Sequence, residues 1–353
     1  MHPYAERTVK TSSSLALRTD ATAIVGGFVA SGLQDLTNDL SALDSTGWWA
    51  VMVPFSGEPI CARFERRRPT GSWPTSQQRW FGPARESWTS SLSYDEFVQR
   101  VEDIRQSIAK GDVYQVNLTR RLSAPLTQDE SIVALGEILS LHNPAPYAAV
   151  LDLPNCAVAS ASPEMFLWRH RNRLRSSPIK GTTAPGVPFT AKDEAENIMI
   201  VDLVRNDFGR LCVPGTIGVP SLLAEQDHPG LVHLVSTIDG ELRASTTWSE
   251  IFAATFPPGS VTGAPKIAAL QHIAALEPVE RGPYCGAIGW VDADQQCGEF
   301  NVAIRTFWIE DDHLHFGTGG AITWDSQPDD EWNETELKAR RLVDLASRRC
   351  DTP

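Results

Sequence analysis

The clearest hydrophobic pattern lies between residues 93 and 111. Apolar side chains recur there at intervals of four, three and four positions, at Phe97, Val101, Ile104 and Ile108. This spacing places them on one face of an α-helix. Ser93 and Glu96 have the spacing of a capping box, and Gly111 is suited to end a helix. The pattern therefore predicts an amphipathic helix over 93–110.

A pattern of period two follows over residues 113–122. Its apolar positions are Tyr114, Val116, Leu118 and Leu122, and its polar positions are Gln115, Asn117 and Thr119. Strict alternation of this kind predicts a β-strand with one polar face. That face either lines a site or faces solvent, and the pattern alone does not separate these two readings.

Weaker patterns predict the remaining elements. Helices are predicted over 191–208 after Thr190, over 266–276 after Pro265, and over 328–346. Strands are predicted over 284–291, 300–308 and 313–316, and residues 47–64 predict a hairpin around Gly57. We interpret the basic cluster 66–68 as an exposed turn. Because strands outnumber helices and occur in runs, an antiparallel α+β sandwich is favoured over a doubly wound sheet.

Composition and charge exclude several classes of protein. With 42% hydrophobic and 21% charged residues, the chain resembles an ordinary globular protein. A formal net charge of -13 argues against a nucleic-acid partner. The sequence has no apolar run near the roughly 20 residues of a membrane span and no signal-peptide pattern, so we expect no membrane association and a cytoplasmic location. The six cysteines form no C-x-x-C pair, which argues against a zinc site or disulfide scaffold.

Two pairs of acidic residues occupy the starts of two predicted helices. Asp193 and Glu196 are three positions apart, as are Glu331 and Glu334, so each pair projects from a single helical face. If the two pairs faced one another, they would form an oxygen-ligand site for magnesium. The alternative is that both pairs serve only the helix dipole and solubility.

Lys180 lies in an apolar, turn-rich segment, SPIKG. It is either an exposed lysine or a nucleophilic amine, and a nucleophile needs its pKa lowered by burial or a nearby cation. Two glycine-rich stretches, PPGSVTGAPK and FGTGGAI, fit neither a Walker motif nor a dinucleotide fingerprint. Their backbone amides are instead candidates for binding a carboxylate.

Together, the ordered motifs of this chain resemble the chorismate-utilising enzymes. The motifs are SASPEMFL (160–167), PIKGT (178–182), ENIMIVDLVRNDFGR (196–210), HLVSTIDG (233–240), FPPGSVTGAPK (256–266), YCGAIG (284–289), IRT (304–306), FGTGGAI (316–322) and NETELKARRL (333–342). The resemblance implies two large antiparallel sheets flanked by helices, with the active site between them. It also implies an N-terminal segment, 1–90, that packs on a chorismate-binding catalytic domain, 91–353.

The resemblance also implies a site. In the family, the glutamates of the E-N/H-x-M-x-V-D motif and of the last helix hold magnesium, and these positions are Glu196 and Glu334 here. Asp193 and Glu331 match neighbouring acidic positions. Magnesium would bind the C1 carboxylate of chorismate. Residues implied to contact the substrate elsewhere are Gln115, Thr182, Tyr284, Arg305, Gly317, Gly319 and Gly320.

Two positions indicate the branch of the family, and two more have implied roles in its reaction. Gln115 stands where the water-adding branch has a lysine base, which argues against water as the nucleophile. The motif PIKGT, with Lys180, is typical of the branch that aminates C4 of chorismate through a lysine adduct at C2. Glu164 is implied to protonate the departing hydroxyl, and His233 is implied to act at the ring.

The implied pathway leads to 4-aminobenzoate and folate. The sequence shows no glutamine amidotransferase module, so a separate subunit is expected to supply ammonia. Two alternatives stay open. One is the anthranilate branch, although its N-terminal L-L-E-S segment is not found, and the other is a catalytically silent protein that only binds.

Overall fold

The computed structural model describes residues 21–127, 130–228 and 231–347. Its strands form a single continuous antiparallel path, in the order β12, β13, β10 with β11, β9, β16, β15, β3, β4, β2, β1, β7, β8, β17, β18, β6. The short strands β5 and β14 also pair with β6.

The strands have the following bounds: β1 Thr22–Val25, β2 Phe28–Thr37, β3 Trp48–Val53, β4 Ile60–Pro69, β5 Thr89–Ser90, β6 Gln115–Pro125, β7 Tyr147–Leu153, β8 Cys156–Ser162, β9 Met165–His170, β10 Arg173–Ser177, β11 Ile179–Thr183, β12 Gly218–His228, β13 Leu231–Glu241, β14 Gly263–Ala264, β15 Ala287–Asp292, β16 Cys297–Val302, β17 Thr306–Glu310 and β18 His313–Ile322. The helices are α1 Tyr94–Lys110, α2 Ile132–His142, α3 Ala191–Gly209, α4 Trp248–Thr255, α5 Lys266–Leu276 and α6 Pro328–Ala346.

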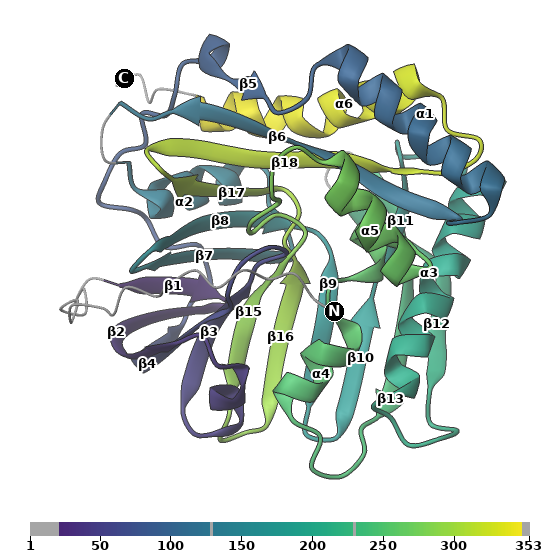
Figure 1. The fold of residues 1–353 in the computed structure, drawn as a ribbon. Helices are drawn as coiled ribbons and strands as arrows, with labels where there is room; N and C mark the ends of the chain where they lie inside the picture. The colour runs from purple at the N-terminus through teal and green to yellow at the C-terminus, as the bar shows by residue number, and fades with distance from the viewer. Residues whose placement is uncertain (1–20, 128–129, 229–230, 348–353) are drawn as a thin grey trace, which may run out of the picture.

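The sheet folds over on itself to give two facing halves. Figure 1 shows β6, β18, β17, β8 and β7 crossing the upper half, while β15, β16, β9, β10, β13 and β12 run down the lower half. The main core joins residues of both halves, among them Leu151 and Val158 with Val51, Ile288 and Phe300. The predicted antiparallel α+β fold is therefore confirmed. The two expected sheets are continuous because β2 is long enough to pair with β1 along one edge and β4 along the other.

Helices cover the outer faces of the sheet. A second core lies between the upper strands and helices α2 and α6, and a third lies between α1, α5 and β6. Arg120 of β6 fixes α6 in place, since its side chain donates to Thr335, pairs with Glu336 and lies 4.2 Å from the ring of Trp332. This contact determines where the acidic residues at the start of α6 lie.

Several predicted elements are confirmed and others are corrected. Helix α1 has the capping box of Ser93 and Glu96 and ends at a left-handed Gly111, as predicted. Tyr114 was expected on the apolar face of the next strand, but it precedes β6 and its side chain is 68% exposed. The basic cluster 66–68 is exposed, but it belongs to strand β4 and not to a turn.

The predicted strand 300–308 is two strands, because the backbone turns at Arg305, where φ is 52°. Strand β18 is longer than predicted. It continues through the glycine-rich stretch to Ile322 because every residue from His313 onward pairs with β6.

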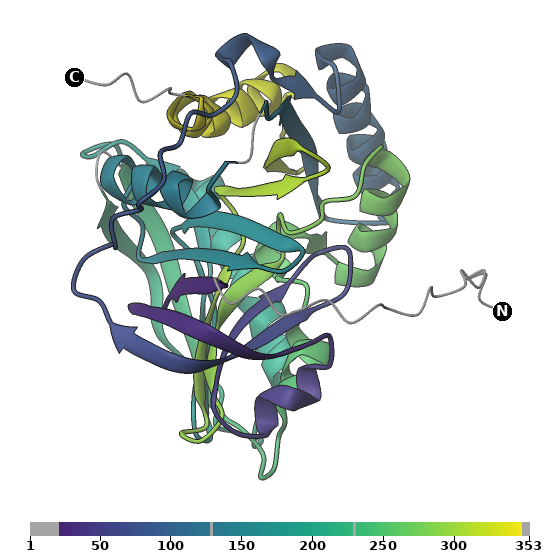
Figure 2. The ribbon, with the colours of Figure 1, turned by 90° about the vertical axis from the view of Figure 1, so that its left-hand side faces the viewer.

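The N-terminal strands share the sheet with the rest of the chain. β1 pairs with β7, and β3 pairs with β15. Figure 2 shows these strands, in purple, across the face turned to the viewer. The division of the chain at residue 90 stays a prediction, and residues 1–20 and 348–353 lie outside the described parts. No helix within the described parts is long and apolar enough to span a membrane.

Candidate active site

Lys180 lies at the centre of a cluster of charged groups drawn from four segments. Its amine interacts electrostatically with Glu196 of α3, with Glu334 and Lys338 of α6, and with Glu164 between β8 and β9. Burial lowers the pKa of Lys180, and Lys338 lowers it further, while the three carboxylates oppose the shift. Among the described residues Lys180 forms no ion pair. Its amine is therefore held close to acids without being tied to one of them.

The backbone around Lys180 is irregular. The pairing of β11 with β13 shifts register between Ile179 and Thr182. Within this bulge Gly181 has a φ of 90°, a conformation that favours glycine. A Cβ at Gly181 would also lie 3.0 Å from Cβ of Asp193 on α3. The glycine of the PIKGT motif therefore lets the strand bulge and lets α3 pack closely beside Lys180.

Glu164 is a buried acid, with 3% of its surface exposed. Burial raises the pKa of Glu164 to about 7, although hydrogen bonds from Ser260 and the Ile179 amide and the charge of Lys180 all lower it. The side chain of Ser162 accepts a hydrogen bond from the Glu164 amide at 3.2 Å, which holds the turn that carries the acid. A carboxyl group with this pKa has a proton to give near neutral pH.

His233 lies on β13 directly opposite Thr182 of β11. Oγ1 of Thr182 lies 2.8 Å from Nδ1 of His233, and the imidazole is 2% exposed. Thr182 was predicted to contact substrate, but in this structure its hydroxyl is engaged with the histidine. The hydrogen bond holds the imidazole in one orientation, with either the hydroxyl or Nδ1 as the donor.

Three of the four acids predicted to bind magnesium lie together where α3 approaches α6. Nζ of Lys192 lies 3.9 Å from Oε1 of Glu196 and 4.0 Å from Oε1 of Glu331, so one ammonium group bridges the two helices. Nζ of Lys338 lies 2.6 Å from Oε1 of Glu334. Burial raises the pKa of Glu196 and of Glu331. Burial also acts to raise the pKa of Glu334, but Lys338, Lys180 and Lys192 together lower it.

Asp193, the fourth predicted ligand, has a different contact. Its carboxylate accepts hydrogen bonds from the amide and hydroxyl of Thr190, at 2.9 and 2.6 Å, as the capping box of α3. No set of three or more acidic, histidine or cysteine side chains in the described ranges is arranged closely enough to hold a metal ion. The lysines lie between the carboxylates instead.

The donor set nevertheless fits a hard cation. Oε1 of Glu331 accepts from Ser326 at 2.5 Å, but Oε2 is buried without a hydrogen-bond partner in the described chain. A Cβ at Gly320 would lie 3.1 Å from this Oε2 and 3.8 Å from Oε2 of Glu334, so the absence of a side chain there leaves room beside both carboxylates. Carboxylate oxygens with unused lone pairs are ligands that magnesium prefers.

Arg305 has the features of an anion-binding residue. It lies at the turn between β16 and β17, and burial lowers its pKa with no charged neighbour among the described residues to oppose the shift. A partly buried guanidinium without a counter-ion is costly, and a bound carboxylate would relieve that cost.

The glycines of FGTGGAI are extended and do not form a nest. Gly317, Gly319 and Gly320 pair with β6, whereas β17 pairs only with His313–Phe316. One edge of the glycine segment therefore has no neighbour among the described strands. A Cβ at Gly317 would lie 2.1 Å from the ring of Tyr284, so this glycine allows the tyrosine to pack against the strand.

The polar face of β6 is buried and does not face solvent, which decides between the two readings of its alternation. Gln115 is fully buried, its Nε2 donates to Oδ1 of Asn117 at 3.1 Å, and its Oε1 has no partner in the described chain. Asn117 in turn donates to the carbonyl of Ser260 at 3.3 Å. Gln115 is thus joined by this network to the residue that contacts Glu164.

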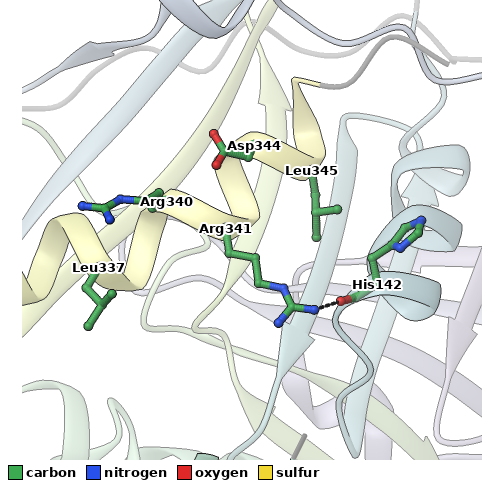
Figure 3. Close-up of a pocket in the computed structure, with 6 residues that line it drawn as sticks. All are labelled: His142, Leu337, Arg340, Arg341, Asp344 and Leu345. Carbon is green, nitrogen blue, oxygen red and sulfur yellow. Dashed lines mark hydrogen bonds between the residues drawn. The ribbon is translucent and has the colours of Figure 1, made fainter. Parts of the chain in front are cut away.

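One pocket of the described structure lies away from these residues. It has a volume of about 300 Å³ and lies between the end of α2 and α6, lined by His142, Leu337, Arg340, Arg341, Asp344 and Leu345. Figure 3 shows Arg341 of α6 pointing toward the backbone carbonyl of His142. None of the predicted site residues lines it. A much smaller cavity borders Glu164, Pro178 and Ser260.

Sequence reasoning missed four residues of the site: Lys192, Asn197, Ser260 and Lys338. The two lysines had a detectable signal, because each lies four positions from an acid on its own helix. Asn197 and Ser260 act through contacts between distant segments, and the sequence carries no local sign of those contacts.

Comparison with known proteins identifies the family. The model of the chorismate binding enzymes matches residues 48–344. Aminodeoxychorismate synthase component 1 of Escherichia coli K12 is 36% identical over 292 residues, which are 77% of this chain and 63% of that protein. Anthranilate synthase component 1 of Streptomyces coelicolor is 37% identical over 277 residues, 74% and 53% of the two chains. The chain thus spans about three-fifths of the length of these bacterial aminodeoxychorismate synthase relatives.

Solved structures share the fold at low sequence identity. The menaquinone-specific isochorismate synthase of Escherichia coli has a TM-score of 0.81 at 18% identity, with 94% of this chain and 90% of that chain covered. A 2,3-dihydroxybenzoate-specific isochorismate synthase of Bacillus anthracis has a TM-score of 0.79 at 21% identity, with coverage of 93% and 96%. On the family match, the chain belongs to the chorismate binding enzymes.

Proposed function

We propose that this chain is the chorismate-binding component of an aminodeoxychorismate synthase, a transferase that replaces the C4 hydroxyl of chorismate with an amino group. The observation that carries the proposal is a buried acid near an amine that forms no ion pair within the described parts of the chain. Glu164, with a pKa raised to about 7, interacts with Lys180, whose pKa burial lowers. The aminodeoxychorismate synthase relatives, at 36% identity, support the same assignment.

The two groups suit a double displacement. The neutral amine of Lys180 bonds to C2 as the C4–O bond breaks and the ring double bond shifts. Glu164 gives its proton to the departing hydroxyl, which leaves as water, and then accepts the proton that the new ammonium adduct loses. Ammonia next bonds to C4, and the C2–N bond breaks as Glu164 returns its proton to the nitrogen of Lys180. The C4 ammonium then gives one proton to Glu164, which restores the starting state of both residues. Because the adduct occupies C2, nitrogen enters at C4.

The remaining residues hold the substrate. Arg305, which lacks a counter-ion in the described chain, suits one carboxylate of chorismate, with Tyr284 and the free edge of the glycine segment nearby. Gln115 offers an unpartnered acceptor oxygen to ammonia or substrate, but an amide cannot act as a base. This argues against water as the nucleophile. We assign to His233 the role of positioning or protonating the ring.

Glu196, Glu331 and Glu334 would hold magnesium. Asp193 lies close enough on α3 for its charge to act on Glu196, and it would assist in binding the ion. When bound, the ion would neutralise the C1 carboxylate and draw electron density toward it. The fit rests on the unpartnered oxygen of Glu331 and the open space at Gly320.

One incubation tests the proposal. Purified chain with chorismate, magnesium chloride and ammonium should yield 4-amino-4-deoxychorismate, identified by liquid chromatography and mass spectrometry. Anthranilate as the product would assign the chain to the other branch, which the Streptomyces coelicolor relative makes the second candidate. No turnover of chorismate would favour a silent binding protein.

We also propose a separate glutamine amidotransferase subunit as the source of ammonia, a cytoplasmic location, and a place before 4-aminobenzoate and folate. The name "component 1" of the relatives supports a partner subunit. The chain should use ammonium alone but use glutamine only with that partner. Hydrolysis of glutamine by the chain alone would contradict this proposal.

A further inference from the structure

A buried amide links the helix that carries Glu196 to the strand that carries Lys180. Asn197 follows Glu196 on α3 and is 1% exposed. Its Nδ2 donates to the carbonyl of Leu234 at 3.0 Å and to the carbonyl of Lys180 at 3.4 Å. Leu234 is the neighbour of His233. One side chain thus contacts the backbone at Lys180 and next to His233, two residues of the candidate active site.

The contact with Lys180 falls at the bulge of β11. Ile179 pairs with Val235 and Thr182 pairs with His233, but the register shifts between them. A bulge leaves backbone groups without ladder partners and redirects the side chain that it carries. The amide of Asn197 supplies a donor at this point, because it bonds to the Lys180 carbonyl within the bulge and to Leu234 on the facing strand.

The orientation of the amide is itself determined by its neighbours. The hydroxyl of Ser236 donates to Oδ1 of Asn197, and the same hydroxyl accepts from the amide of Leu223 at 2.9 Å. The two carbonyls can only accept, so they alone require Nδ2 to face them, and Oδ1 is then left to accept from Ser236. The network therefore reaches from α3 through β11 and β13 to β12.

We propose that Asn197 is a positioning residue for the reaction: its amide holds the bulge of β11 so that the amine of Lys180 is presented at a fixed place beside the carboxylates. Asn197 does not touch the reacting atoms and acts through the backbone of Lys180. This inference rests on the proposed role of Lys180 as the nucleophile.

Three variants separate positioning from stability. Asn197→Ala removes the donor to the Lys180 and Leu234 carbonyls. Ser236→Ala is the matched control, because it also leaves buried polar groups unpartnered but keeps both donor contacts of Asn197. Asn197→His restores an N–H donor, since a neutral imidazole carries one. Melting temperature and circular dichroism would establish that each variant folds.

Amination kinetics with saturating ammonium give the first readout. We expect Asn197→Ala to lower kcat by about 10²-fold with KM for chorismate within about twofold, because a small displacement of a reacting group costs that much. Asn197→His should recover most of this loss. Ser236→Ala should lower the melting temperature as much as Asn197→Ala does while kcat stays within about threefold.

Labelling gives a second readout that does not need turnover. The probe is an amine-reactive anhydride, used at one fixed pH, and the measurement is the rate of modification of Lys180 divided by that of exposed Lys110. This ratio should change several-fold in Asn197→Ala and stay the same in Ser236→Ala. An unchanged ratio and kcat in a folded Asn197→Ala variant would overturn the proposal, as would an equal loss of kcat in Ser236→Ala. If Lys180→Ala retained full activity, the proposed function would fail instead, and the labelling ratio would still test the positioning.

Discussion

Oγ1 of Thr182 and Nδ1 of His233 lie 2.8 Å apart across the pair of strands β11 and β13. The PIKGT motif therefore supplies the candidate nucleophile, Lys180, and also Thr182, two positions later, which orients His233. Through this hydrogen bond, strand β11 connects Thr182 to His233, which lies 51 positions later in the sequence.

Thr182→Val should disturb His233 without removing it. Loss of the hydroxyl frees Nδ1 to adopt another tautomer or rotamer, so we expect kcat to fall by about tenfold, less than the roughly 10²-fold or greater effect of losing a general acid or base. Thr182→Ser keeps the oxygen and should retain near wild-type kcat. Steady-state kinetics with ammonium measure both, and equal rates for Val and Ser would refute the orienting role.

Glu164→Gln should alter both activity and the pH dependence of stability. Burial raises the pKa of Glu164 from 4.5 to about 7, so the folded state keeps a proton that the unfolded state has already lost. As the pH rises from 4.5 to 7, the free energy of unfolding of the wild type should fall by about 3 kcal/mol relative to that of Glu164→Gln. Outside this range the difference between the two proteins should not change with pH.

Urea denaturation of both proteins at pH 4.5, 6 and 8 would measure this difference. The activity of the wild type should decline above pH 7 as Glu164 ionises, and Glu164→Gln should be nearly inactive at every pH. If the free energies of unfolding of the two proteins changed with pH in the same way, the pKa of Glu164 would be the same in the folded protein as in water, and the prediction would be wrong.

Lys180→Ala should remove the nucleophile and open C2 to ammonia. We expect formation of 4-amino-4-deoxychorismate to fall by 10²-fold or more, with part of the residual product shifted to anthranilate or its precursor. Wild-type protein with chorismate and magnesium but no ammonium should show a mass adduct on the peptide containing Pro178 and Thr182. Full activity of the variant without any adduct would exclude the covalent route.

Glu334→Gln should raise the magnesium concentration needed for half-maximal activity or abolish turnover, because it removes one charged ligand. Activity of the wild type should disappear with a chelator and return with added magnesium. Turnover that a chelator leaves unchanged would exclude a metal requirement.

Lys192→Met should have the opposite effect on magnesium binding. The ammonium group lies 3.9 and 4.0 Å from Glu196 and Glu331, so it competes with a cation for the same carboxylates. We expect magnesium to bind about five- to tenfold more tightly, as measured by calorimetry without substrate, since pairs at this distance near a surface contribute on the order of 1 kcal/mol. Lys110→Met, at an exposed helix end, should bind magnesium like the wild type.

Local sequence determined much of the scaffold. The capping boxes of Ser93 with Glu96 and of Thr190 with Asp193 mark the starts of α1 and α3, because they satisfy backbone groups within one turn of the chain. The paired spacing of Glu331 and Glu334 likewise places both on one side of α6. Such signals depend only on neighbouring residues, so they can be read without knowledge of the fold.

Tertiary structure decided the site itself. Lys192 between Glu196 and Glu331, the raised pKa of Glu164 and the contact of Asn197 with Lys180 all arise where segments distant in sequence meet. The motif showed that Lys180 is present, but only the bulge of β11 and its burial show how its amine is placed. Burial and charge act through space, and no pattern of neighbouring residues encodes which distant groups will surround a side chain.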